Sequence, residues 1–397
     1  MEFKEILKWI LNLLIILNIF LILSIIFYGG YEIEIWRILI KCHNIKNPFI
    51  GLIIFIIIRI CISIGKINSI LLISSITVAL LFFEIFLRIT NNPLSFPNLK
   101  EIIEPYPLLG YRLIAGIKDG NISINSHHLR DRERSWIKPE GIKRILGIGD
   151  SFTFGYKVSN EQCFLKILEK LLNTESYVWD VINAGVPGYN MWQYVRYLEN
   201  FGYRYMPDLI IVSIYLDDFY GSPGFKVLSI KKSNNYKFYK KIRVINFLNN
   251  FYEKLIYRYR FLFGAKWLKD VESRRSYFLA NRYGRLLKGT ENRNIYSRFE
   301  YELGRIKALI DLIGSNLLVI YIPDVVQLNF PALKVLNRKI DLMCKNREID
   351  FIDMTSYLEN SGNINELYLL PYDAHLSYRG HYVVARVLYN YIKKMGY

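Results

Sequence analysis

Three long apolar runs within the first ninety residues constrain this chain more than any other feature. They are dominated by Ile, Leu and Phe and cover residues 9–28, 48–65 and 69–86. Each is close to the ~20 residues that a helix needs to cross a hydrocarbon core ~30 Å thick. None carries the polar stripe at a 3.6-residue period that a surface helix of a globular domain would show. We therefore predict three transmembrane helices in residues 1–90.

The direction of insertion is less constrained. The first run could serve as a signal peptide, but no small-residue cleavage site follows it and two further runs do. Lys4 and Lys8 precede the run, whereas Arg37, Lys41 and Lys46 follow it. Because these flanking charges nearly balance, charge alone does not decide which side of the membrane the N-terminus faces.

The rest of the chain alternates between short apolar segments and longer amphipathic ones. Residues 91–140 are rich in proline at first and include the polar stretch Asn125 to Glu133, so we interpret them as a linker and pre-domain segment. Strands are predicted at 144–149, 178–183, 208–215, 316–323 and 349–354. A helix is predicted at 161–172, after a Ser159/Gln162 capping box. Near-continuous Ile, Val and Leu strands that alternate with helices indicate an α/β domain at 141–397, with a doubly wound parallel sheet.

One stretch interrupts this alternation. Residues 226–305 contain 20 Lys and Arg residues against six acidic ones, interleaved with aromatic residues, and carry most of the formal net charge of +17. We predict a mainly helical insertion that faces a membrane surface or covers the site as a lid. A solvated structural face is the alternative. Nucleic acid is disfavoured as a partner, because the three apolar runs already place the chain beside lipid.

The strongest chemical signal follows the first predicted strand of the domain. Residues 149–155 read Gly-Asp-Ser-Phe-Thr-Phe-Gly. A serine at the carboxyl end of a strand, bracketed by glycines, can lie on a tight turn with its hydroxyl exposed and nearby N–H groups free to bind an oxyanion. Ser151 is therefore the candidate nucleophile.

The chain offers few bases for this serine. Of its five histidines, only His375 and His381 follow the predicted sheet. Asp373 and His375 are two residues apart, which places both side chains on one side of an extended backbone. The carboxylate could then orient the imidazole toward Ser151, as in serine triads. A last helix is predicted at about 377–394. His381 falls in its first turn, where packing or capping is the simpler role.

No residues indicate a cofactor or a metal. The four cysteines, Cys42, Cys61, Cys163 and Cys344, show neither a CxxC motif nor Cys/His ligand spacing. No dinucleotide-phosphate loop is present either.

Because it combines the Gly-Asp-Ser motif with the Asp-x-His pair, the chain resembles the SGNH/GDSL hydrolase superfamily. More narrowly, it resembles membrane-tethered bacterial members related to polysaccharide O-acetylation proteins. The resemblance runs from about residue 83 to the C-terminus, apart from the basic insertion. It implies Ser151 as nucleophile and Asp373 with His375 as the acid–base pair. It also implies an oxyanion hole made by the N–H of Ser151 and that of Gly188, with Gly185 as the alternative glycine.

One position departs from the family pattern. The resemblance places an asparagine after the third strand, where its amide donates to the oxyanion, but this chain has Asp217 there. An ionised carboxylate has no proton to donate. Asp217 could be protonated in an apolar pocket, Asn183 or Asn190 could replace it, or the enzyme could be slow or degenerate.

The resemblance implies a membrane-anchored serine esterase or O-acyltransferase without a cofactor, acting through an acyl-Ser151 intermediate on O-acetyl groups of an envelope or surface glycan. A transferase would need a membrane partner that delivers acetyl groups. It further implies a multi-pass protein with Met1 in the cytoplasm and Ser151 outside. The alternatives are a lipid or lysophospholipid esterase, for which the insertion would be an interfacial lid, and a non-catalytic scaffold in a glycan-export complex.

Overall fold

The computed structural model describes residues 3–28, 31–35, 38–42, 46–89, 99–119, 122–174, 178–220, 244, 290–329, 334–370 and 373–396. The chain divides into two compact units. One comprises Met1–Thr90 and Tyr239–Arg275, and the other, called here the sheet domain, comprises Asn91–Phe238 and Ser276–Tyr397.

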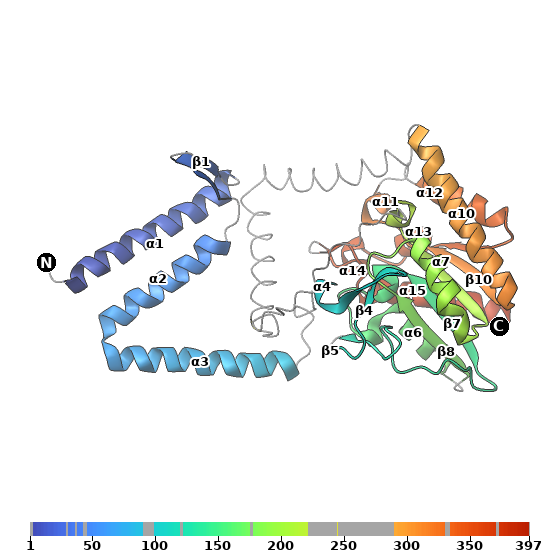
Figure 1. Cartoon of the computed structure of the whole chain (residues 1–397), viewed down its shortest axis with the longest axis horizontal. Coiled ribbons are helices and arrows are strands. Elements are labelled where there is room, and N and C mark those ends of the chain that lie inside the picture. Colours follow the sequence, from blue (N-terminus) through green and yellow to red (C-terminus); the bar gives the residue numbers. More distant parts are fainter. Residues whose placement is uncertain are drawn as a thin grey trace. The chain divides into compact units, whose positions relative to one another are not determined.

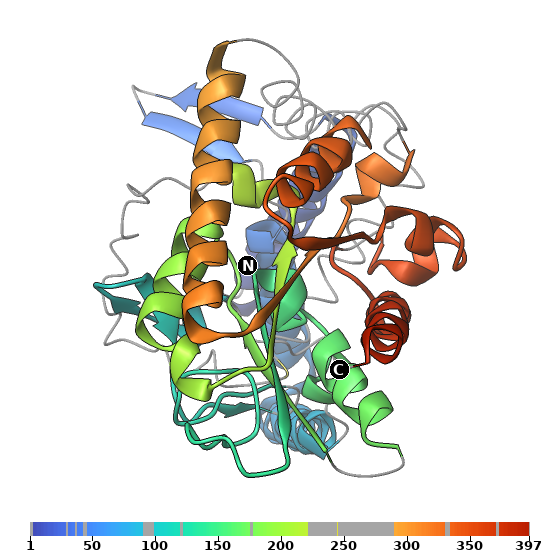
Figure 2. The same cartoon turned by 90° about the vertical axis from the view of Figure 1, so that its right-hand side faces the viewer.

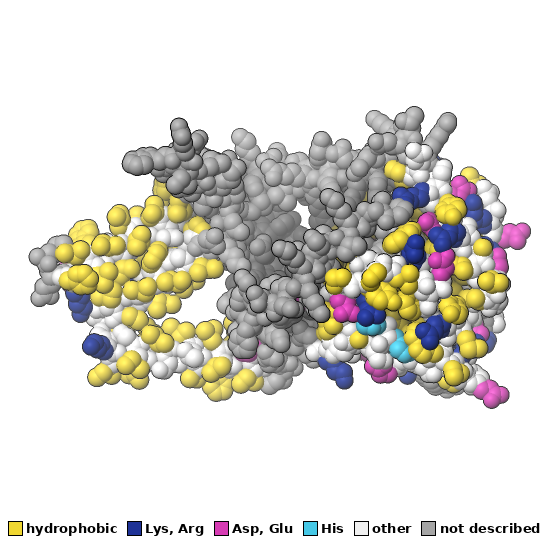
Figure 3. Space-filling model, viewed as in Figure 1, with side chains coloured by type: hydrophobic (Ala, Val, Ile, Leu, Met, Phe, Trp, Pro, Cys, Tyr) yellow, Lys and Arg dark blue, Asp and Glu magenta, His cyan; other side chains and the backbone are white. Residues whose placement is uncertain are grey.

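Apolar helices dominate the first unit. They are α1 (Phe3–Tyr28), α2 (Lys46–Ile64) and α3 (Lys66–Ile89), and a hairpin of β1 (Tyr31–Ile35) and β2 (Ile38–Cys42) follows α1 (Figure 1). Two segments in the described part of the chain, Phe3–Ile22 and Lys66–Phe86, are long and apolar enough to cross a membrane, and Pro48–Ile64 forms a shorter apolar helix. Their Ile, Leu and Phe side chains point outward, as the hydrophobic surface of these helices shows in Figure 3. Such a surface suits lipid better than water.

The sheet domain is built on five parallel strands. These are β7 (Lys143–Gly149), β8 (Trp179–Gly185), β9 (Leu209–Ile214), β10 (Asn316–Tyr321) and β11 (Asp350–Asp353). Their order across the sheet is β11-β10-β9-β7-β8, and all pairings are parallel. All five predicted strands are present, and the predicted α/β class with a parallel sheet is confirmed.

Helices cover both faces of this sheet (Figure 2). One face packs against α7 (Met191–Asn200), α10 (Thr290–Ile313) and α12 (Val335–Lys345). The other packs against α6 (Phe164–Leu172), α11 (Val325–Asn329), α13 (Thr355–Glu359) and α15 (Tyr378–Met395). The remaining short elements are α5 (Ser151–Phe154), α14 (Ile364–Leu367) and the 3₁₀ turns η2 (Asn160–Gln162), η3 (Gly202–Tyr205) and η4 (Leu216–Tyr220).

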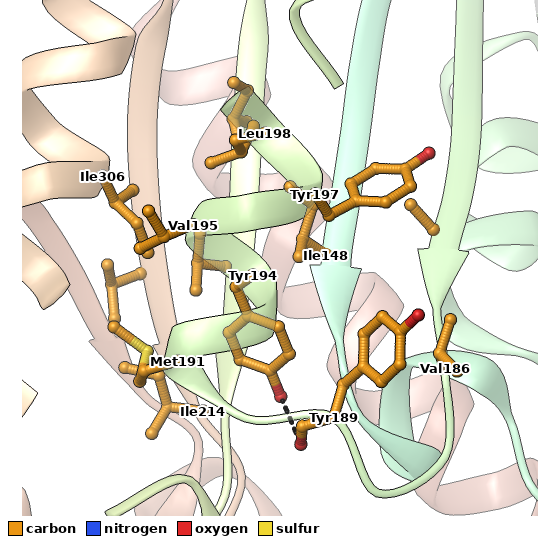
Figure 4. Packing of buried hydrophobic residues seen from close by; sticks show 14 of the residues in the cluster. Ile148, Val186, Tyr189, Met191, Tyr194, Val195, Tyr197, Leu198, Ile214 and Ile306 are labelled. Carbon is orange, nitrogen blue, oxygen red and sulfur yellow. Dashed lines mark hydrogen bonds between the residues drawn. The ribbon is translucent and has the colours of Figure 1, made fainter. Parts of the chain in front are cut away.

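The core explains why these segments form an α/β sandwich. Figure 4 shows Tyr194, Val195 and Leu198 of α7 beside Ile148 of β7 and Ile214 of β9. All five side chains are at most 2% exposed. Burial of each large apolar side chain contributes about 1.5–3 kcal/mol, so a strand with apolar residues on both faces is stable only between two helical layers.

The segment interpreted as a linker and pre-domain segment is grouped with the sheet domain, and much of it forms regular structure. It forms α4 (Leu99–Ile102), the hairpin β3 (Ile103–Tyr106) with β4 (Gly110–Leu113), and the hairpin β5 (Lys118–Asp119) with β6 (Ile122–Ser123). Its apolar residues, including Ile102, Leu113 and Leu129, join the same core as α7 and α10. Of the prolines that suggested a linker, Pro105 lies in β3 and Pro107 in the turn that follows it, whereas Pro93 and Pro97 lie outside the described residues.

A buried ion-pair network holds this segment to the sheet. Asp131 accepts from Arg134 at 2.9 Å, from Lys166 of α6 at 2.8 Å and from the backbone N–H of Asn183 at 3.0 Å. Burial of Glu169 opposes its ionisation, but Lys166 and Arg134 lower its pKa to about 2. Because each buried charge has several partners, removing one would leave the others uncompensated.

Most of the predicted basic insertion lies outside the described residues. Its last part, 290–305, forms the first turns of α10, which pack on the sheet through Tyr296, Phe299 and Leu303. The lid and membrane-surface roles of residues 226–289 remain predictions.

Candidate active site

The strand order places the candidate site at a topological switch point. From β7 the chain moves to β8 on one side, and from β9 it moves to β10 and β11 on the other. In open α/β sheets, ligands bind at the carboxyl ends of the two strands that flank this reversal. Ser151 follows β7, and Asp217 follows β9.

The turn after β7 places Ser151, which is half-buried, at the carboxyl end of the strand. Ser151 is the first residue of α5, and the carboxylate of Asp150 caps this helix by accepting from the Phe152 N–H at 2.9 Å. A Cβ on Gly149 would lie 2.1 Å from Oγ1 of Thr153, so the turn can close this tightly only with glycine there. The glycine before the serine is therefore a steric requirement of the turn.

Ser151, His375 and Asp373 come together although 224 residues separate the serine from the histidine. Nε2 of His375 lies 2.7 Å from Oγ of Ser151. Nδ1 of the same ring contacts Oδ1 of Asp373, which also accepts from the His375 backbone N–H at 2.9 Å. With Nδ1–H donating to the carboxylate, Nε2 is the acceptor for the serine proton.

The carboxylate of this group is held in its charged form. Oδ2 of Asp373 forms an ion pair with Nζ of Lys157 at 2.9 Å. Burial opposes the ionisation of Asp373, but its contacts with His375 and Lys157 outweigh burial and hold its pKa below its usual range. The carboxylate therefore stays ionised at neutral pH and can orient the imidazole.

Aromatic rings flank the imidazole. The ring centroids of Phe152 and Tyr156 each lie 5.0 Å from that of His375. Burial raises the pKa of Tyr156, with a smaller effect of the Asp373 charge, so this phenol is neutral at physiological pH. These rings restrict where the imidazole can rotate.

Two backbone N–H groups, those of Ser151 and Gly188, are candidates for binding an oxyanion. The N–H of Ser151 lies at the start of α5, where helices have no internal acceptor to offer. Gly188 is exposed and has φ +78°, a conformation that favours glycine. Its loop is joined to β7 by a hydrogen bond from the Val186 N–H to the Gly149 carbonyl at 3.0 Å. Gly185, the alternative glycine, donates its N–H to Oδ1 of Asn183 at 3.0 Å. The geometry thus favours Gly188 over Gly185.

Neither Asn183 nor Asn190 supplies the side-chain donor to the oxyanion that the resemblance implies. The amide of Asn183 is fully buried and directed at Sγ of Cys163, 3.5 Å away. The amide of Asn190 donates to Gln193 at 3.0 Å, while its carbonyl caps α7. Asp217 itself is exposed on η4, so the apolar pocket considered for it is not found.

The buried acid after β9 is Asp218 instead. Its carboxyl accepts from the Tyr194 hydroxyl at 2.8 Å and from the Tyr215 N–H at 2.7 Å. Burial, with the nearby charge of Asp150, raises the pKa of Asp218 well above its ordinary value. Burial also raises the pKa of Asp150 to about 6, and the Asp217 charge adds to the effect. Three carboxyl groups therefore cluster at the carboxyl ends of β7 and β9.

His381 lies away from the serine. It is fully buried near the start of α15, its Nδ1 accepts from the Phe164 N–H at 3.3 Å, and its ring stacks on that of Phe164. Burial lowers the pKa of His381 to about 3, which keeps it neutral. This is the packing role expected for it.

Two site residues were missed by sequence reasoning. Lys157 contacts Asp373 although nothing but its closeness to the Gly-Asp-Ser motif singles it out. Arg130 lies in the polar stretch before the domain and contacts the carbonyls that follow the nucleophile helix. The concentration of charged residues in this stretch, just before the first strand of the domain, was the available signal.

No family model matches the sequence, and no curated protein does. Solved structures with a similar fold include TesA (12% identity, TM-score 0.40), covering 64% of this chain and 99% of that one. A lipolytic protein of the G-D-S-L family from Desulfitobacterium hafniense has 12% identity and a TM-score of 0.37, covering 62% and 98%. The acetylxylan esterase Axe2 from Geobacillus stearothermophilus has 13% identity and a TM-score of 0.37, covering 64% and 94%. In fold, the chain is thus similar to G-D-S-L lipolytic proteins and acetylxylan esterases.

Proposed function

We propose that this protein is a membrane-anchored serine esterase that forms an acyl intermediate on Ser151. One observation carries the proposal: Nε2 of His375 lies 2.7 Å from Oγ of Ser151 while the opposite ring nitrogen contacts Asp373. Nucleophile, base and orienting carboxylate in this arrangement are the parts that acyl transfer to a serine needs.

The reaction follows from these contacts. Oγ of Ser151 attacks the ester carbonyl carbon as its proton passes to Nε2 of His375, and the ionised Asp373 stabilises the imidazolium. The carbonyl oxygen gains the negative charge and is bound by the N–H groups of Ser151 and Gly188. The imidazolium then protonates the leaving alcohol, which departs and leaves the acyl group on Oγ. Attack by a second hydroxyl compound, assisted by the same imidazole, releases the acyl group.

This oxyanion hole has no side-chain amide among the described residues that surround the serine. Loss of one oxyanion donor typically lowers the rate by 10²–10³. We therefore propose a slow enzyme rather than a non-catalytic scaffold, because nucleophile, base and carboxylate are all in place.

The proposed substrate is an O-acetyl group on an envelope or surface glycan, as the sequence resemblance implies. The apolar helices support a location at the membrane. Water as acceptor makes the enzyme a hydrolase, and a sugar hydroxyl makes it an O-acetyltransferase that depends on a membrane partner for its acetyl groups. Both reactions use the same acyl-Ser151 intermediate.

The test uses the full chain in detergent with p-nitrophenyl acetate and p-nitrophenyl decanoate. We expect hydrolysis of the acetate ester that is lost in Ser151→Ala, with a lower kcat/KM for the longer ester. A higher kcat/KM for the decanoate would favour the lipid esterase. Absence of Ser151-dependent turnover, together with no labelling of Ser151 by a fluorophosphonate, would support the scaffold and overturn the proposal.

Orientation is tested separately, since it decides access to an envelope glycan. We propose that the N-terminus is cytoplasmic and that the sheet domain lies outside. Reporters active on only one side of the membrane, fused after Tyr397 and after Asn44, should both report the outside. A cytoplasmic signal from the fusion after Tyr397 would exclude the envelope glycan as substrate.

A further inference from the structure

The turn that follows the nucleophile helix is held by a buried guanidinium. Arg130 is 1% exposed, and its donors reach the carbonyl oxygens of Phe154 at 2.7 Å, Gly155 at 2.5 Å and Val158 at 2.5 Å. Its Nε donates to Oδ1 of Asn160 at 2.7 Å. Burial lowers the pKa of Arg130 to about 10, so it remains charged at neutral pH. A planar group with several fixed donors can hold a turn in one conformation, which a point charge cannot.

Lys157 lies within that turn in an unfavourable conformation. Its φ is +66°, in the left-handed region that residues with a side chain seldom occupy. Such a conformation persists only where the surroundings enforce it, and it occurs often at functional sites. Here the carbonyl groups on both sides of Lys157 are those bound by Arg130.

The ammonium of Lys157 contacts the carboxylate that orients the base. Nζ lies 2.9 Å from Oδ2 of Asp373, while Oδ1 of that carboxylate contacts His375. A carboxylate fixed at both oxygens cannot rotate away from the imidazole. The chain of contacts therefore runs from Arg130 through the turn and Lys157 to the acid–base pair, and the same turn follows Ser151 directly.

We propose that Arg130 and Lys157 act together as positioning residues for this acid–base pair. Arg130 fixes the turn at 154–158, and the turn presents Lys157 to the Asp373 carboxylate. The inference rests on the proposed esterase function and adds to it two residues that join the nucleophile to the loop bearing its base.

Lys157→Met is the main test, with full-length protein and p-nitrophenyl acetate. Met keeps the length of the side chain and removes the charge. We expect kcat to fall about 10-fold with KM within about twofold, because the orientation of the base changes and the binding of substrate does not. The acidic limb of the kcat/KM profile should move to higher pH, because the imidazolium loses a repelling cation. Lys157→Arg should restore most of kcat.

A matched control separates this role from surface charge in general. Lys334 has a similarly exposed side chain (35% against 38%) and pairs with Glu359 at 2.8 Å, on helices that carry none of the proposed site residues. Lys334→Met should leave kcat and the pH profile unchanged. Wild-type kcat and pH profile in Lys157→Met would overturn the proposal for Lys157. No Ser151-dependent turnover in the wild type would overturn the proposed function itself, and the positioning role with it.

Arg130 is tested by the conservative change Arg130→Lys, normalised to folded protein by its thermal transition. Lysine keeps the charge but cannot bind three carbonyls in fixed geometry. We expect kcat per folded molecule to fall about 10-fold and the pH profile to shift as in Lys157→Met, with little further loss in the double variant. If activity falls only in proportion to the folded fraction, Arg130 is a structural residue and this half of the proposal is wrong.

Discussion

Two neighbouring turns at the carboxyl edge of the sheet differ sharply in what they bring to the site. The turn after β7 carries Ser151, and its conformation depends on a glycine that allows close approach and on a carboxylate that caps the helix. The turn after β9 carries Asp217 and Asp218. In that turn a side chain would have to donate to the oxyanion, but Asp217 has a carboxylate, which only accepts when ionised.

The difference lies in what each turn can tolerate. Substituting Gly149 would place a Cβ 2.1 Å from Thr153, so the fold itself preserves the nucleophile turn. Exchanging an amide for a carboxylate at exposed Asp217 changes the charge and replaces a donor with an acceptor, but it adds no atoms that the fold must accommodate. The turn after β9 can therefore depart from the family pattern without loss of structure.

The largest effect on activity is expected from a substitution in the turn after β7. Ser151→Ala removes the nucleophile, so kcat for p-nitrophenyl acetate should fall about 10⁴-fold or more, as is usual when a serine triad loses its nucleophile. The thermal transition should stay close to that of the wild type, because the hydroxyl contributes only its contact with His375 and a long one, at 3.5 Å, with Asp150. Retention of more than a hundredth of the activity would show that another group performs the attack.

Much of this turn could be predicted from the sequence, because its motif is local. The strand before it, the glycines around Ser151 and the Asp-x-His spacing of Asp373 and His375 all lie within short stretches. The contact between Lys157 and Asp373 could not be predicted, because it depends on how two distant loops meet. The catalytic roles assigned to these residues remain predictions that the substitutions test.

The turn after β9 was harder to predict. Which of two adjacent carboxyls is buried depends on how the 3₁₀ turn η4 rotates its side chains, and neither periodicity nor composition encodes that rotation. The structure buries Asp218 against Tyr194 and exposes Asp217. The short elements of the pre-domain segment were also hard to predict, because prolines indicate a break in regular structure but not whether the segment around them is buried.

The second prediction concerns Gly188, in the loop joined to the nucleophile strand. Gly188→Ala forces a side chain into a φ of +78° and places its Cβ 2.8 Å from Oη of Tyr111. The N–H should shift, and kcat should fall about 10²-fold, the usual cost of one oxyanion donor. Gly141→Ala is the matched control, because Gly141 has φ +75° and open space around it. Equal kcat in both variants would mean that Gly188 does not bind the oxyanion.

The third prediction asks whether the turn after β9 limits the rate. Asp217→Asn supplies an amide donor and removes a negative charge that acts on Asp150. We expect kcat to rise about 10-fold, with stability unchanged because the side chain is exposed. Asp341→Asn removes a carboxylate on α12 whose side chain is 37% exposed, and it should change neither kcat nor stability. An unchanged kcat in Asp217→Asn would leave the two backbone N–H groups as the whole oxyanion hole.

The smallest effect is expected at Asp150, and it is an effect on stability. The charge of Asp217, in the turn after β9, acts on this carboxyl in the turn after β7. Burial raises its pKa to about 6 in the folded protein, against 3.8 ordinarily. A carboxyl with a raised folded pKa contributes stability that is complete below pH ~4 and is lost as pH rises through about 6, a loss of about 3 kcal/mol at most.

Asp150→Asn retains an oxygen that can cap the Phe152 N–H and removes the titration. Its unfolding free energy should therefore exceed that of the wild type by more at pH 7.5 than at pH 4.5. Glu169 and Asp373, whose pKa values are lowered, titrate at more acidic pH in both proteins and do not affect this comparison. Chemical denaturation of both proteins at these two pH values measures the difference, and a difference independent of pH would show that Asp150 does not titrate in this range.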